Sequence, residues 1–168
     1  EKRLLKREGF SFDPALKLGA MIETPAAALS ADGFAQRLDF LSIGTNDLSQ
    51  YTLAIDRTDD QVNYLFDPLH PAVLRLIHNV IQASKKNGIP VSLCGELAGD
   101  DRYTRLLLGM GLHEFSMSPS LLPEVKQEVL NTRVDMTEPL VEQILQSPFH
   151  DEIYRLFEQI NRFSPDHS

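Results

Sequence analysis

Short apolar runs alternate with longer helical segments along this chain, and this alternation limits its fold more than any other feature. Four runs are predicted to be buried strands, at residues 18–22, 40–43, 90–93 and 114–117. Each is followed by a segment with helical spacing of apolar residues or with residues typical of helix starts. Repeated strand–helix units form a parallel sheet with right-handed crossovers. The sequence therefore predicts an α/β fold.

The expected helices have recognisable start and end signals. One helix is predicted over residues 24–37, a short one over 48–55, and a long amphipathic one over 71–88 with glycine at its end. Further helices are expected to begin after Asp100, at Leu121, at Thr137 and at Ser147, the last ending near Phe163.

Composition excludes several classes of protein. The 168 residues, enough for a single domain over 1–168, include 16 Lys and Arg against 24 Asp and Glu, a net charge of −8. Nucleic-acid binders usually carry a basic face, so we expect no nucleic-acid partner. No apolar run is long enough to span a membrane. The single cysteine, Cys94, cannot form an internal disulfide, which fits a reducing cytoplasm.

Polar side chains gather where three of the predicted strands end. They are Glu23 after the first strand, Asn46 and Asp47 after the second, and Cys94 and Glu96 after the third. The carboxyl ends of parallel strands meet at one edge of a sheet, where ligands bind in α/β folds. Carboxylate and amide oxygens suit Mg²⁺. Arg57, which closes the second unit, suits a substrate carboxylate or phosphate.

Each of these residues also has an ordinary structural interpretation. Asn46 and Asp47 are common capping residues, and the dipole of the following helix favours a charge such as that of Glu23. Arg57 could form a surface ion pair with a neighbouring aspartate. Cys94 could be a small buried apolar side chain. Spacing alone leaves both interpretations open.

One motif closely resembles a signature of the enzymes that use phosphoenolpyruvate (PEP): Ser-Ile-Gly-Thr-Asn-Asp-Leu-Ser-Gln-Tyr at 42–51, followed by Asp56 and Arg57. The resemblance is strongest to Enzyme I of the bacterial sugar phosphotransferase system, a PEP–protein phosphotransferase. It extends from about Lys17 into the last helix. Cys-Gly-Glu-Leu-Ala-Gly-Asp at 94–100 and Asp-Pro-Leu-His-Pro at 67–71 also resemble Enzyme I.

The resemblance implies a role for each residue at the strand ends. By this resemblance Glu23 and Asp47 hold Mg²⁺, whereas Asn46, Asp47 and Arg57 contact PEP. Cys94 matches the family's proton donor, a neutral thiol that protonates the methylene carbon of enolpyruvate. Glu96 and His70 are candidates for supporting roles beside them.

The resemblance also implies a fold, a reaction and partners. Enzyme I carries its PEP site on a (β/α)8 barrel, so four strand–helix units imply the C-terminal half of a TIM barrel. The implied reaction moves the phosphoryl group of PEP to a histidine of the enzyme and then to a phosphocarrier protein, leaving pyruvate. A homodimer is implied as well. Because other arginines and the phosphorylated histidine of the family lie outside this chain, we expect the chain alone to be inactive.

Two alternatives remain open. PEP synthase and pyruvate phosphate dikinase share the barrel, although the motifs at 67–71 and 94–100 resemble Enzyme I more. A non-catalytic module for PEP binding or dimerisation is the other, because half a barrel exposes sheet edges that a partner would cover.

Overall fold

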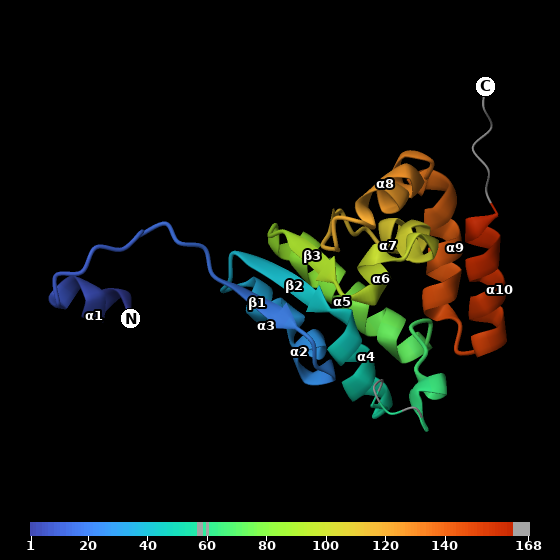
Figure 1. Ribbon diagram of the computed structural model, residues 1–168, viewed down its shortest axis with the longest axis horizontal. Coiled ribbons are helices and arrows are strands. Elements are labelled where there is room, and N and C mark those ends of the chain that lie inside the picture. Colours follow the sequence, from blue (N-terminus) through green and yellow to red (C-terminus); the bar gives the residue numbers. More distant parts are fainter. Residues whose placement is uncertain (57–58, 60, 163–168) are drawn as a thin grey trace.

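Parallel strands form the centre of the structure, a computed structural model that describes residues 1–56, 59 and 61–162 (Figure 1). The strands are β1 (Gly19–Ile22), β2 (Phe40–Gly44), β3 (Val91–Cys94) and β4 (Glu114–Phe115). They pair in the order β1-β2-β3-β4, and every pairing is parallel. Helices lie in each crossover, so the predicted α/β class is confirmed.

Helices occupy most of the remaining described residues. They are α1 (Lys2–Arg7), α2 (Pro25–Leu29), α3 (Ala31–Ala35), α4 (Thr45–Leu53), α5 (Pro71–Asn87), α6 (Glu96–Gly99), α7 (Thr104–Gly109), α8 (Leu122–Leu130), α9 (Val134–Gln146) and α10 (His150–Asn161), with 3₁₀ turns η1 (Asn63–Leu65) and η2 (Asp101–Tyr103). In Figure 1, α1 stands apart from the sheet at the end of an extended segment, and none of its residues is buried. No helix within the described ranges has both the length and the apolarity needed to cross a bilayer.

The two faces of the sheet differ in how they are covered. Ile22, Ile43 and Leu93 are fully buried in one core together with apolar side chains of α5 and other helices. Burying each such side chain contributes about 1.5–3 kcal/mol. Successive residues of a strand point to opposite faces. Accordingly Met21 is 48% exposed and Ser42 is half-buried, so the second face, which we call the open face, lacks a covering layer in the described residues.

The helix predicted over residues 24–37 is wrong in its length. It divides into α2 and α3 at Ser30, whose backbone has φ −96° and ψ 12°. Serine at the junction and Gly33 within α3 are both weaker helix formers than alanine. The start predicted for the short helix is also wrong, because α4 begins at Thr45 rather than Leu48. The candidate site residues 46 and 47 therefore lie in the first turn of a helix.

The helix predicted to begin at Thr137 begins earlier, at Val134, and carries Pro139 in its interior. Interior proline usually costs about 3 kcal/mol. Gly109 of α7 offers a reason why the helix persists: a Cβ there would lie 2.6 Å from a methyl carbon of Val141, so the missing side chain lets α9 approach closely. Packing between the two helices outweighs the local signal.

The start predicted for the last helix is wrong too, because α10 begins at His150 and Ser147 is instead the C-cap of α9. The remaining boundaries are close to the predictions. β3 is displaced by one residue from the predicted 90–93, and β4 covers only the first half of the predicted 114–117. The long helix agrees well: α5 begins at Pro71 and ends at Asn87, and the next residue, Gly88, caps it in the left-handed conformation with φ +67°. The last helix ends at Asn161, and its predicted end near Phe163 falls outside the described residues.

Candidate active site

The ends of β1, β2 and β3 bring Glu23, Gly44 and Cys94 together. Gly44, the last residue of β2, pairs with Cys94 at the end of β3. On its other side, a Cβ at Gly44 would lie 3.1 Å from Glu23 Cβ and 3.2 Å from Glu23 Oε2. A side chain at position 44 would thus fill the space beside the carboxylate. The glycine leaves a small cradle between Glu23 and the thiol-bearing strand.

The thiol of Cys94 is half-buried and lies among groups from β1 and β2. Its Sγ donates to the carbonyl oxygen of Ile43 at 3.4 Å, and the hydroxyl of Ser42 donates to Sγ across a longer 3.9 Å. Met21 Sδ is also 3.9 Å from Sγ. Glu96 is exposed in the first turn of α6, just after Cys94, and its supporting role stays a prediction.

A second set of contacts ties the turn after β2 to the turn after β3. Asn46 Oδ1 accepts a hydrogen bond from the backbone N–H of Glu96 at 3.1 Å. The hydroxyl of Thr45 donates to the carbonyl oxygen of Cys94 at 2.9 Å. Asn46 therefore does not cap its own helix, whose N-cap position is Gly44 without a side-chain hydrogen bond. Its amide nitrogen lacks a hydrogen bond to any described residue and is a donor suited to an anion.

Gly95 belongs to this site, although the sequence did not single it out. Its φ of +103° is accessible to glycine but strained for other residues. A Cβ at this position would lie 2.5 Å from Thr45 Oγ1 and 2.9 Å from Asn46 Oδ1. The bare glycine is what allows the two turns to approach. The sequence did contain one signal for this role: Gly95 directly follows a strand that ends in a candidate nucleophile or acid.

His70 has a structural role in the loop before α5. Its Nδ1 accepts from the backbone N–H of Ala72 at 3.2 Å, which caps the helix. Its ring meets the ring of His150 edge-on, with centroids 5.7 Å apart. His150 Nε2 in turn lies 2.6 Å from Asp67 Oδ2, and the hydroxyl of Tyr154 donates to Asp67 Oδ1 at 3.0 Å. These contacts attach α10 to the start of α5.

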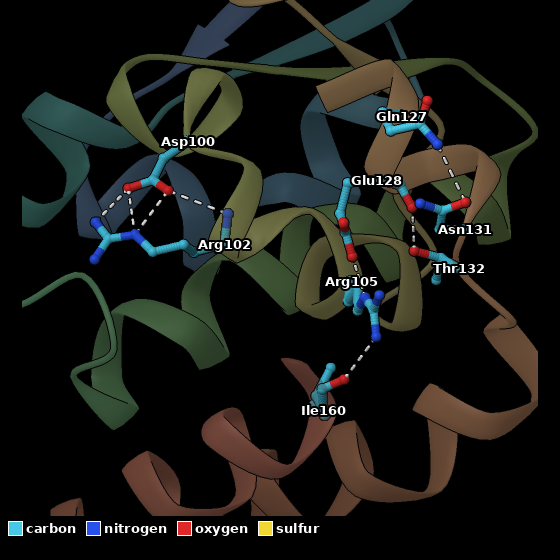
Figure 2. Close-up of polar contacts among 8 residues, drawn as sticks. All are labelled: Asp100, Arg102, Arg105, Gln127, Glu128, Asn131, Thr132 and Ile160. Atoms are coloured by element: carbon cyan, nitrogen blue, oxygen red, sulfur yellow. Dashed lines mark hydrogen bonds and ion pairs between the residues drawn. The ribbon is translucent and has the colours of Figure 1, made fainter. Parts of the chain in front are cut away.

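Two separate sets of polar contacts, around Asp100 and around Arg105, follow the Cys94 turn in the sequence (Figure 2). Asp100 caps η2 by accepting from the backbone N–H of Arg102, and hydrogen bonds from the Arg102 guanidinium hold the pKa of Asp100 below its usual range. Arg105, which is 6% exposed, pairs with Glu128 of α8 and donates to the carbonyl oxygen of Ile160 at 3.2 Å. Arg105 therefore joins α7 to both α8 and α10.

The strand ends carry two carboxylates of the kind that Mg²⁺ binds. Glu23 is half-buried beside its glycine cradle, and Asp47 is exposed in the first turn of α4. Mg²⁺ commonly uses one or two protein carboxylates and completes its octahedron with water and substrate oxygens. Within the described part of the chain there is no group of three or more histidine, cysteine, aspartate or glutamate side chains that could hold a metal ion. Arg57, the predicted PEP-binding arginine, lies outside the described residues.

Comparisons with known proteins show the family to which the chain is similar. A family model described as "PEP-utilising enzyme, PEP-binding domain" matches residues 1–134. Among curated proteins, the phosphoenolpyruvate-protein phosphotransferase of Cupriavidus necator is 58% identical over 146 residues, covering 87% of this chain and 25% of that protein. The proteins of the same name from Haemophilus influenzae and Listeria monocytogenes are 48% and 47% identical, covering 94% and 95% of this chain and 28% of each relative. The chain thus spans about a quarter of the length of these relatives.

Proposed function

Because this chain belongs to the family of PEP-utilising enzymes and carries residues of their PEP-binding domain, we propose that it forms the PEP site of a PEP–protein phosphotransferase of the sugar phosphotransferase system. The parent reaction moves the phosphoryl group of PEP to a histidine of the enzyme and on to a histidine-containing phosphocarrier protein. The observation that carries the proposal is the meeting of Glu23, Gly44 and Cys94 at neighbouring strand ends, inside the matched residues.

Glu23 and Asp47 are the proposed holders of Mg²⁺. Bound there, the ion would offset negative charge on the phosphoryl and carboxylate oxygens of PEP. The cradle beside Glu23 supports this role because position 44 presents no side chain to the carboxylate. With a net charge of −8, an anionic substrate needs a local positive charge, which either a metal ion or an arginine can supply.

Asn46 is the proposed contact for the phosphoryl group, with Asp47 beside it and Arg57 as a second, charged contact. The hydrogen bond from Glu96 N–H holds the Asn46 oxygen, so the amide nitrogen is directed to donate to another group. A guanidinium binds phosphate in a bidentate manner and supplies both charge and geometry.

Cys94 is the proposed general acid. When PEP loses its phosphoryl group, enolpyruvate remains, and its methylene carbon must gain a proton to become the methyl group of pyruvate. The S–H bond of Cys94 breaks, the new C–H bond forms, and the thiolate keeps the electron pair. The position of the thiol at a strand end on the open face supports this role.

We place the chain in the C-terminal half of a TIM barrel, as one domain over residues 1–168, in a cytoplasmic homodimer. The open face, with its exposed Met21 and half-buried serines, fits the interior of a barrel that further strands close. The same face favours a second candidate function, a non-catalytic PEP-binding or dimerisation module. The names of the relatives favour the phosphotransferase over a dikinase or PEP synthase.

Calorimetric titration of PEP tests the site. We expect binding to the longer parent protein to require Mg²⁺ and to be lost in Asp47→Asn, whereas the chain alone does not turn over PEP. We expect Cys94→Ala in the parent to abolish pyruvate formation while PEP binding is retained. Unchanged turnover in Cys94→Ala would exclude the proton-donor role, whereas PEP binding by a parent protein that does not turn PEP over would favour the non-catalytic candidate.

A further inference from the structure

A pair of serines lies directly beneath the proposed proton donor. Ser42 of β2 and Ser92 of β3 pair in register, and both point to the open face because their neighbours Ile43 and Leu93 are buried in the core. Serine is a poor strand former compared with the branched and aromatic residues that fill most strands. Two paired serines, each two residues before the end of its strand, are therefore unusual at the centre of a sheet.

The two hydroxyls form a directed chain to the sulfur. Ser92 Oγ donates to Ser42 Oγ at 3.2 Å, Ser42 Oγ donates to Cys94 Sγ at 3.9 Å, and Sγ donates to the carbonyl oxygen of Ile43 at 3.4 Å. A serine hydroxyl carries a single proton. Because the Ser92 hydroxyl is the donor in the hydrogen bond between the serines, the Ser42 hydroxyl can donate its own proton to the sulfur. Ser92 thereby determines which way Ser42 points.

We propose that Ser92 is a positioning residue for proton transfer by Cys94, acting through Ser42. This inference rests on the proposed function, in which Cys94 protonates enolpyruvate. As the S–H bond breaks and the C–H bond forms, negative charge develops on sulfur, and the Ser42 hydroxyl donates to it. The hydrogen bond from Ser92 keeps Ser42 in that donating orientation and strengthens it by polarisation.

The same chain provides a route for returning the proton. The thiolate takes the proton of Ser42, Ser42 takes the proton of Ser92, and Ser92 takes one from a water molecule at the open face, where its side chain is half-buried. The net change is one S–H bond restored and one proton taken from solvent. In a purely structural explanation, the two hydroxyls only satisfy each other's hydrogen bonding. That explanation predicts that replacing Ser92 changes the stability of the protein but not the rate of proton transfer.

The test uses the longer parent protein with PEP, Mg²⁺ and the phosphocarrier protein. In Ser92→Ala we expect kcat for pyruvate formation to fall about tenfold, the effect of losing roughly one hydrogen bond in the transition state. KM for PEP should stay the same, and the solvent deuterium isotope effect on kcat should rise because proton transfer becomes slower. Ser92→Thr keeps the hydroxyl and should retain most of kcat.

Two controls separate the possible failures. Ser120→Ala removes a serine–serine contact of similar length, 3.1 Å to Ser118, and should change neither kcat nor the isotope effect. Cys94→Ala tests the premise. If Cys94→Ala is inactive but Ser92→Ala matches the parent in kcat and isotope effect, the role of Ser92 is refuted and the proposed function stands. If Cys94→Ala remains active, the proton-donor role of Cys94 is overturned and the role of Ser92 with it, whereas the PEP site itself is judged separately by the loss of PEP binding in Asp47→Asn.

Discussion

Gly95→Ala probes how closely the turns after β2 and β3 must approach, and Gly88→Ala is its matched control. Both glycines have positive φ, +103° for Gly95 and +67° for Gly88. They differ in their surroundings. A Cβ at Gly88 would meet no atom within 4 Å, whereas a Cβ at Gly95 would lie 2.5 Å from Thr45 Oγ1 and 2.9 Å from Asn46 Oδ1. Gly88 has the ordinary left-handed conformation, whereas Gly95, with ψ −173°, lies in a region open essentially to glycine alone, so both backbone strain and collision are greater at Gly95.

The expected magnitudes follow from these contacts. Gly88→Ala should lower the free energy of unfolding by about 1 kcal/mol, the cost of the left-handed conformation for alanine. Gly95→Ala adds a steric collision and disturbs two hydrogen bonds, from Thr45 to Cys94 and from Glu96 to Asn46. We expect a total loss of about 3–6 kcal/mol. Because Asn46 must move, PEP binding should also weaken about tenfold or more, equivalent to roughly one hydrogen bond.

Urea unfolding followed by circular dichroism measures the first effect, and calorimetric titration of PEP with Mg²⁺ into the parent protein measures the second. Gly88→Ala should leave PEP affinity unchanged, since it lies at the far end of α5. Equal losses of stability in the two variants, together with normal PEP affinity in Gly95→Ala, would refute the argument that position 95 sets the approach of the two turns.

Three further predictions concern stability. Arg105→Ala should cost about 3–5 kcal/mol because it leaves Glu128 without its buried partner, whereas Arg105→Met combined with Glu128→Leu should cost much less; equal losses in urea unfolding would contradict this. Arg102 lowers the pKa of Asp100, so Asp100 contributes stability that is present above its unfolded pKa of about 4 and is lost as the pH falls through its folded pKa. In Asp100→Asn we expect the free energy of unfolding to fall less steeply below about pH 4. An unchanged fall would argue against the ion pair. Burial raises the pKa of Tyr154 to about 12, so its contribution is present below about pH 10 and is lost towards pH 12; Tyr154→Phe should remove that alkaline loss, measured by unfolding at pH 9 and pH 12.

The sequence predicted the elements whose signals lie within a few residues. The helix of α5 begins at proline and ends at glycine because those residues preset or permit the required backbone angles. The apolar runs became parallel strands for a similar reason, since buried strands have a local composition of their own. The resemblance identified the family from motifs of ten residues or fewer, and the comparisons agree with it.

The tertiary structure decided which of those elements meet. Asn46 and the N–H of Glu96 are 50 residues apart, and Ser42 is 50 residues from Ser92, so no local pattern joins either pair. The importance of Gly95 and the start of α9 before Pro139 are likewise consequences of close packing between distant segments. Local propensities are worth about 1 kcal/mol or less per residue for most residue types, whereas packing sums many contacts. The sequence by itself determined which segments form strands and helices, although not all of their ends, and to which family the chain belongs. The parallel register of β1, β2 and β3 decided how Glu23, Gly44 and Cys94 come to share one edge.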